Sequence, residues 1–146
     1  MSARVTRTAQ ASWQGDLTGG GRIGVGSGAY EGPFTLRARV EDVDRSTNPE
    51  ELIGAAHAGC FTMSLANLLS ESGHPPADLR TTARVRLEQL DTGFAITRIE
   101  LQTQGEVPGV DDETFARLAQ QAKDTCPVSR ALAGTEITLE VRLAGS

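Results

Sequence analysis

Residues 48–60 read Asn-Pro-Glu-Glu-Leu-Ile-Gly-Ala-Ala-His-Ala-Gly-Cys, and they decide the fold because they open the strongest helix signal in the chain. Asn48 suits the N-cap, Pro49 suits the first helical position, and two glutamates in the first turn complement the helix dipole. Residues 52–71 are almost all apolar or small, and Gly73 with two following prolines ends the segment. A helix that is apolar on nearly every side is predicted to be a buried central core helix.

The residues before this helix predict strands. Strand-like runs at 4–13, 22–26 and 34–41 alternate with glycine-rich turns, which indicates an antiparallel meander. The glycine-rich turn at 18–21 lacks the lysine and the following helix of a phosphate-binding loop, so we expect no nucleotide site there.

The residues after the helix predict a hairpin, a surface helix and a last strand. Strand-like runs at 82–89 and 94–103 flank an Asp-Thr-Gly turn. From Asp111 onward, apolar residues recur at helical spacing and give one apolar stripe, and residues 136–143 alternate as a final strand. Since the chain has no repeat or linker, we predict a single domain over residues 1–146 with an α+β architecture.

Composition and charge exclude several classes of partner. The chain has 146 residues, a formal net charge of -5 and a pI near 5.0, and its basic residues are scattered. This argues against nucleic acid or an anionic membrane as a partner. No stretch has the length of a signal-peptide core or of an uninterrupted membrane span, so we expect a cytoplasmic location. Two cysteines in that compartment are more often catalytic, redox-active or metal-binding than bridged for stability.

Cys60 lies in the middle of the predicted helix, where the simplest interpretation is a small apolar core residue. It is about 18 Å along the axis from Asn48, so the helix dipole does not reach it. Burial raises the pKa of a thiol, and a reactive Cys60 therefore needs a cation from elsewhere. The first candidate is His57, one turn away, which can equally be a core histidine. The others are Arg37 and Arg39, which would share one face of a strand.

Cys126 has a different local setting. Pro127 suits the first helical position, which places Cys126 at an N-cap, where free backbone N–H groups stabilise a thiolate. The alternative is a capping or loop cysteine without reactivity. Two cysteines and two histidines match a zinc site by number, but the close ligand pairs are missing, so we expect no metal.

Three segments taken together resemble the OsmC family. They are residues 48–52, residues 55–61, and Cys-Pro-Val-Ser at 126–129. This family joins the osmotically inducible protein C type with the organic hydroperoxide resistance type, and the likeness runs over nearly the whole chain. The resemblance implies an intertwined homodimer with antiparallel sheets wrapped around long central helices. It also implies a thiol peroxidase that acts on organic hydroperoxides, is reduced by a dithiol (lipoyl groups in some members), and needs no metal, flavin or other cofactor.

The resemblance also assigns residues to roles. Cys60 matches the peroxidatic cysteine and Cys126 the resolving cysteine, so a Cys60 sulfenic acid would condense with Cys126 to a disulfide. Glu50 matches the acidic partner of an active-site arginine. Arg39 fits the OsmC-type branch, with Arg37 left open. Because Glu50 and Cys60 would lie about 15 Å apart on a straight helix, either the helix breaks or Glu50 comes from the other subunit. We expect the second, with the active site at the dimer interface.

Two other functions remain open from the sequence. The cysteines could form a slow disulfide in a thiol redox sensor, or the fold could bind a small molecule or lipoyl group without peroxidase turnover.

Apolar residues near Cys60 would favour alkyl over hydrogen peroxide, namely Leu52, Ile53, Phe61 and Met63. Small residues that would let a second backbone approach the helix are Gly54, Ala55, Ala58 and Gly59.

Overall fold

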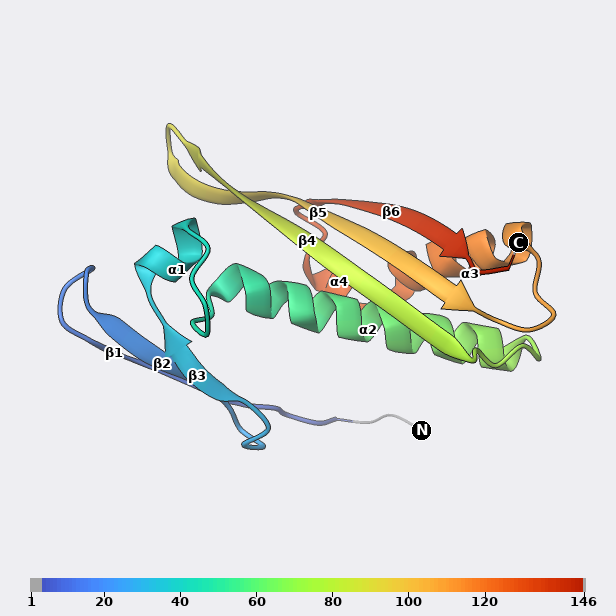
Figure 1. Cartoon of the computed structure of the whole chain (residues 1–146), viewed down its shortest axis with the longest axis horizontal. Helices are drawn as coiled ribbons and strands as arrows, with labels where there is room; N and C mark the ends of the chain where they lie inside the picture. The colour runs from blue at the N-terminus through green and yellow to red at the C-terminus, as the bar shows by residue number, and fades with distance from the viewer. Residues whose placement is uncertain (1–3, 146) are drawn as a thin grey trace. The chain divides into compact units, whose positions relative to one another are not determined.

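A computed structural model describes residues 4–145, so residues 1–3 of the N-terminal segment and residue 146 lie outside the described residues. The chain divides into two compact units, Met1–Leu52 and Ile53–Ser146, and each carries a three-stranded sheet (Figure 1). The α+β prediction is confirmed. The single domain stays a prediction.

The first unit contains the predicted meander. Its strands β1 (Ala9–Gln14), β2 (Gly20–Val25) and β3 (Glu31–Phe34) pair antiparallel in that order. In the turn between β1 and β2 the Asp16 carboxylate accepts hydrogen bonds from the N–H and the hydroxyl of Thr18, at 2.9 and 2.7 Å. The meander is confirmed, although β1 begins later than the sequence pattern predicted.

The predicted strand over residues 34–41 is wrong, because a short helix, α1 (Leu36–Val40), takes its place. The Thr35 hydroxyl accepts a hydrogen bond from the Ala38 N–H at 3.0 Å, which caps a helical turn where alternation had suggested a strand. Arg37 and Arg39 are two residues apart and therefore diverge on a helix instead of sharing one face.

The helix α2 (Pro49–Glu71) begins as predicted, since the Asn48 side chain accepts from the Glu51 N–H at 2.8 Å. Within a single chain it is not buried on nearly every side. Phe61, Leu65 and Leu69 are fully buried, but only 28% of an 18-residue window of the helix is buried within the chain. By length and composition α2 could cross a membrane, a test that the core helix of a soluble protein also passes.

The second unit is built on the predicted hairpin, which is confirmed with longer strands. Strand β4 (Asp78–Leu90) pairs antiparallel with β5 (Gly93–Glu106), and Gly93 takes the positive φ of 121° that the tight turn requires. Strand β6 (Glu136–Leu143) pairs parallel with β5. A parallel pair needs a crossover, and two helices supply it.

The crossover helices are α3 (Asp112–Thr125) and α4 (Pro127–Ala131). The Asp111 carboxylate caps α3 by accepting from the Thr114 N–H at 2.7 Å, so this helix start is confirmed. Helices α2 and α3 bury their apolar faces against the sheet of the second unit (Figure 1). The fully or nearly fully buried side chains of this core include Phe61, Leu65, Leu69, Ile99, Leu101, Phe115, Leu118, Ala119 and Ala122.

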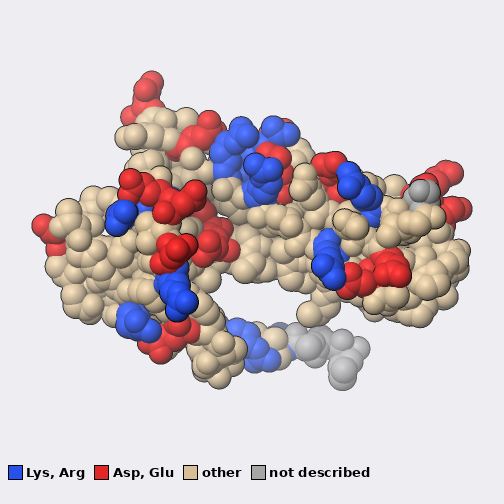
Figure 2. Space-filling view, viewed as in Figure 1, with Lys and Arg blue, Asp and Glu red and all other residues tan. Residues whose placement is uncertain are grey.

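Charged side chains of both signs are mixed on the face seen in Figure 2. On the outer face of the β4–β5–β6 sheet, Arg86 lies 3.8 Å from Glu100 and Arg98 lies 3.7 Å from Glu136. These partly exposed pairs each contribute little to stability, because water and salt screen them.

Gly105 on β5 allows the ring of Phe115 to pack against the sheet. A Cβ at this position would lie 2.6 Å from the ring atom Cζ of Phe115, whereas a Cβ at Gly134 would meet nothing within 4 Å. We predict that Gly105→Ala lowers the free energy of unfolding by about 1–3 kcal/mol, because the core would be overpacked. Gly134→Ala is the matched control and should stay within about 0.5 kcal/mol of the parent. Urea denaturation of both variants checks this, and equal effects would contradict it.

Candidate active site

Arg39 and Glu50 form a two-pronged ion pair in the first unit. Arg39 Nε donates to Glu50 Oε1 at 2.8 Å, and Arg39 Nη2 donates to Glu50 Oε2 at 2.7 Å. The carboxylate side chain is 8% exposed and the arginine side chain 35% exposed. The hydrogen bond to Glu50 raises the pKa of Arg39 further above its usual value, against the opposing effect of burial. The pair is therefore a preformed, fully charged unit with one part of the guanidinium open to solvent.

Arg37 takes a different partner. Its Nε donates to Glu41 at 2.9 Å, one turn later in the chain, and the two side chains are 75% and 60% exposed. Of the two arginines that the sequence left open, Arg39 is the one that contacts Glu50. The catalytic roles of both stay predictions.

Asn48 holds the elements that carry this ion pair. Its side-chain N–H donates to the Ala38 carbonyl at 3.0 Å, while its side-chain oxygen caps the start of α2. One amide thus ties the last turn of α1 to the first turn of α2. This connection fixes the backbone next to Arg39 against the backbone next to Glu50.

An apolar pocket of about 200 Å³ lies beside Arg39 within the first unit. The rings of Trp13 on β1 and Phe34 on β3 form its wall, with centroids 5.3 Å apart and planes tilted by 59°. A Cβ at Gly21 on β2 would lie 2.7 Å from the Phe34 ring, so only glycine lets these rings close over the sheet. The rest of the lining comes from Leu17, Thr35, Leu36 and Pro49.

Two free thiols meet in the second unit. Cys60 lies on α2 and is partly exposed, whereas Cys126 precedes α4 and is fully buried. The two thiols lie close enough to alter each other's pKa: Cys126 raises that of Cys60, and Cys60 lowers that of Cys126. The structure thus brings together the two cysteines that the sequence singled out, from positions 66 residues apart.

Backbone N–H groups at the start of α4 point at both sulfurs. Cys126 is the N-cap of α4, as predicted, and its Sγ accepts from the Ser129 N–H at 3.5 Å. The Val128 N–H donates to the sulfur of Cys60 and to that of Cys126. Unpaired N–H groups at a helix start carry partial positive charge and stabilise a thiolate.

The two thiols differ in acidity because each hydrogen bond between them has a direction. Burial raises the pKa of Cys60, and donation of its proton to Cys126 raises it further. Burial also acts to raise the pKa of Cys126, but hydrogen bonds from Cys60 and from Ser129 outweigh it and lower the value. The negative charge of a Cys126 thiolate also raises the pKa of Cys60, and no positively charged group in the described chain is among the causes that act on it. A single chain therefore keeps the proton on Cys60 and favours a thiolate at Cys126.

His57 is fully buried and does not supply the missing cation. Burial lowers its pKa, so the imidazole is neutral near pH 7. Its Nε2 lies 2.7 Å from the Ser129 hydroxyl oxygen, and its Nδ1 has no hydrogen-bond partner among residues 4–145. His57 and Ser129 thus form a buried polar array next to Cys126.

Sequence reasoning gave no role to Ser64 or Ser129. The pKa of Cys60 is raised overall, and the Ser64 hydroxyl is a smaller influence that acts to lower it. The signal available in the sequence was the spacing of four residues on one helix. Ser129 follows Cys126 by three residues, the spacing of a residue that a helix N-cap contacts. Within residues 4–145, no group of three or more His, Cys, Asp or Glu side chains is arranged to hold a metal ion.

Comparison with known proteins identifies the family. The family model described as OsmC-like protein matches residues 42–142. The chain is 45% identical over 141 residues to peroxiredoxin OsmC of Escherichia coli strain K12. This match covers 95% of this chain and 97% of the relative. It is 33% identical over 106 residues to organic hydroperoxide resistance protein OhrA of Bacillus subtilis strain 168, covering 70% and 72%. The chain belongs to the OsmC-like family, and the resemblance drawn from its motifs is confirmed.

Solved structures share the fold. An organic hydroperoxide resistance protein from Elizabethkingia anophelis superimposes with a TM-score of 0.80 at 26% identity, covering 98% of this chain and 99% of that one. An OsmC-like protein from Mycoplasma pneumoniae gives a TM-score of 0.77 at 13% identity, with coverage of 97% and 99%. At that lower identity the similarity concerns the fold alone.

The buried neutral state of His57 makes stability depend on pH. The unfolded chain takes up a proton near the ordinary histidine pKa of 6.5, while the folded chain does so only at lower pH. We therefore predict that the free energy of unfolding falls as the pH drops below about 6.5, with a slope of up to about 1.4 kcal/mol per pH unit. His57→Gln should remove this part of the slope, and His74→Gln is the control. Denaturation between pH 5 and 8 checks it, and an unchanged slope in His57→Gln would refute it.

Proposed function

We propose that this protein is a thiol peroxidase that reduces organic hydroperoxides to alcohols, with Cys60 as the attacking thiolate and Cys126 as the resolving thiol. The observation that carries the proposal is that two free thiols from distant parts of the chain lie close enough to alter each other's pKa. Support comes from relatives named as a peroxiredoxin and as an organic hydroperoxide resistance protein. Sulfurs in hydrogen-bond contact need only a small movement to become bonded.

The chemistry balances in two steps. The Cys60 thiolate attacks the terminal peroxide oxygen, the O–O bond breaks, and the alkoxide leaves and takes a proton to become the alcohol. Cys60 is then a sulfenic acid. The Cys126 thiolate attacks its sulfur, the S–O bond breaks, and hydroxide leaves and is protonated to water. The disulfide that results prevents further oxidation of Cys60.

The first step requires a positive charge at Cys60, and no cation is among the groups that act on its thiol in the second unit. We infer that Arg39 of a second subunit provides it, oriented by Glu50. The helix α2 is continuous from Pro49 to Glu71, which excludes the helix break considered from sequence. Ten residues of helix separate Glu50 from Cys60 by about 15 Å along the axis. Arg39 would stabilise both the Cys60 thiolate and the charge on the departing oxygen.

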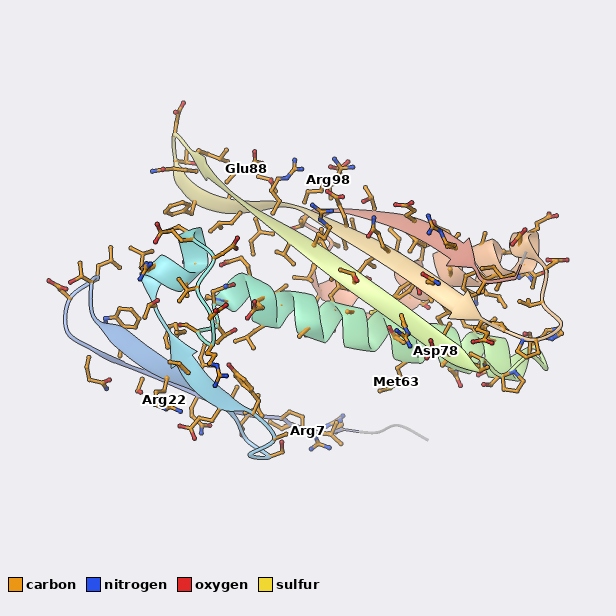
Figure 3. All side chains as sticks on the ribbon, viewed as in Figure 1. Arg7, Arg22, Met63, Asp78, Glu88 and Arg98 are labelled. Atoms are coloured by element: carbon orange, nitrogen blue, oxygen red, sulfur yellow. The ribbon has the colours of Figure 1, made fainter. Side chains whose placement is uncertain are left out.

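The open face of α2 supports a homodimer. Ala55, Gly59 and Met63 are exposed along this face, and Met63 is 75% exposed. Figure 3 shows Met63 projecting from α2 away from the β4–β5–β6 sheet. Gly54 does not belong to this face, because a Cβ there would lie 3.4 Å from Val85 of β4. We propose that a second copy covers the face, since a long row of small apolar groups is unfavourable in water.

Substrate preference is proposed to come from apolar surface near Arg39. Phe61, which the sequence suggested as part of a pocket, is fully buried in the core and lines no open site. The pocket formed by Trp13 and Phe34 is apolar and has Arg39 in its lining. An alkyl or aryl tail would bury its surface there while the peroxide group faces the guanidinium.

The remaining parts of the proposal concern the reductant and the location. Reduction of the disulfide requires two electrons, which a dithiol such as a lipoyl group supplies without a bound cofactor. A cytoplasmic location is proposed because both cysteines are free thiols, the normal state in that compartment.

A thiol count tests the reaction. One equivalent of cumene hydroperoxide should remove both thiols from reduced protein within seconds, because attack and resolution follow each other in one site. Cys60→Ser should abolish peroxide consumption. Cys126→Ser should allow one turnover and then over-oxidise at Cys60, as seen by mass spectrometry.

Thiol loss over hours would instead indicate a sensor. Consumption of at most one equivalent with excess dihydrolipoamide would indicate a binding module. Equal turnover of hydrogen peroxide would exclude the apolar pocket.

Subunit mixing tests whether Arg39 acts across the dimer. Arg39→Ala should lose about 10²–10³-fold in rate of peroxide reduction, because the charge on the thiolate and leaving oxygen is no longer balanced. After unfolding and refolding together with Cys60→Ser, random mixing should restore about a quarter of the wild-type activity, since half the dimers carry one complete site. No recovery in verified mixed dimers would place Arg39 in its own chain's site.

A further inference from the structure

The buried polar array behind Cys126 has no role in the peroxide step. We propose that His57, acting through Ser129, is a positioning residue that holds Cys126 as a thiolate, so that the regenerating dithiol enters at Cys60 and Cys126 is the sulfur that leaves. This inference rests on the proposed disulfide cycle and adds the direction in which the disulfide is reduced.

The array connects two helices through short contacts. His57 on α2 is fully buried, and its Nε2 lies 2.7 Å from Ser129 Oγ on α4. Ser129 is itself almost completely buried, and its N–H lies 3.5 Å from Cys126 Sγ. The Ser129 hydroxyl also acts to lower the pKa of the Cys126 thiol. His57 therefore reaches the sulfur through a single residue, Ser129.

Burial fixes the direction of these hydrogen bonds. A neutral imidazole carries one proton, and an orphaned buried N–H is among the rarest features of native structures. Because His57 Nδ1 has no partner in the described part of the chain, the proton belongs on Nε2. Nε2 then donates to Ser129, which leaves the single hydroxyl hydrogen of Ser129 free for the Cys126 sulfur. If Ser129 donated this hydrogen to His57 instead, the hydrogen would no longer be available to the Cys126 sulfur.

Donors converge on Cys126, which makes it the better leaving group. The Ser129 N–H lies 3.5 Å from the Cys126 sulfur. After the hydrogen bond from Cys60, the N–H and the hydroxyl of Ser129 are the next groups that lower the pKa of Cys126, and together these groups outweigh burial. A disulfide breaks faster toward the sulfur that is the more stable thiolate. Access of the reductant also favours attack at Cys60, since Cys60 is partly exposed and Cys126 is fully buried.

The reduction then balances as follows. One thiolate of the dithiol attacks the Cys60 sulfur and the Cys60–Cys126 S–S bond breaks. Cys126 leaves as a thiolate, which the donors of Ser129 stabilise. The second dithiol sulfur, deprotonated, attacks the reductant sulfur of this mixed disulfide and expels Cys60 as a thiolate. The dithiol becomes a cyclic disulfide and the protein gains two electrons.

The first test measures the thiolate at Cys126 in a Cys60→Ser background, by absorbance at 240 nm against pH. Ser129→Ala and His57→Leu should each raise the Cys126 pKa by about one unit, because the donor to the sulfur is removed or turned away. His57→Gln keeps an N–H near Ser129 and should restore part of the shift. Ser64→Ala is the matched control, because Ser64 contacts position 60 and not Cys126.

The second test identifies the sulfur that is attacked. Protein oxidised with diamide is treated with glutathione, a monothiol that stops at the mixed disulfide, and the adduct is mapped by peptide mass spectrometry. Wild type should carry glutathione on Cys60. Ser129→Ala should form the adduct about three- to tenfold more slowly, because Cys126 leaves less readily.

An unchanged Cys126 pKa in folded Ser129→Ala, or an adduct on Cys126 of the wild type, overturns the inference. Ser129→Ala removes one oxygen atom, so the test does not depend on the bulkier change at His57. Neither measurement uses a peroxide. Failure of the thiol count with cumene hydroperoxide would reject the proposed peroxidase alone, whereas failure here with normal peroxide turnover would reject the His57 role alone.

Discussion

The close approach of two free thiols, Cys60 and Cys126, is the interaction on which the site depends. Two neighbouring thiols cannot both ionise easily, and the surrounding groups decide which one does. The hydrogen bond from Cys60 and the donors of Ser129 favour charge on Cys126. The attacking role proposed for Cys60 therefore requires a positive group near its sulfur, and the proposed dimer would supply it.

The two units supply complementary parts of the proposed reaction. The first unit holds Arg39 charged and oriented by a carboxylate that is nearly buried, and Asn48 fixes the helices that carry the pair. The second unit holds both thiols, Cys60 on α2 and Cys126 at the start of α4. An arginine already paired in this way loses little conformational entropy when a thiolate or peroxide approaches. In the proposed dimer, each copy would contribute one part to each site.

Local signals in the sequence predicted some elements and not others. The start of α2 was predictable because Asn48, Pro49 and the following glutamates act within one turn. The N-cap position of Cys126 was predictable for the same reason. Residues 34–41 were mispredicted, since alternating side chains suggested a strand while the Thr35 cap closed a helical turn. Burial of α2 was overestimated because composition does not reveal which neighbours a single chain can place around it.

By itself the sequence determined the helix that carries Cys60 and the N-cap position of Cys126, because helix ends are local properties, and its motifs carried the resemblance to the family. Only the tertiary structure decided that Arg39 and not Arg37 contacts Glu50, that His57 is neutral, and that Ser129 links His57 to Cys126. Each of these features depends on contacts between buried or partly buried side chains from different elements. Such contacts set the acidity of a group and the direction of its hydrogen bonds, and no pattern along the chain encodes them directly.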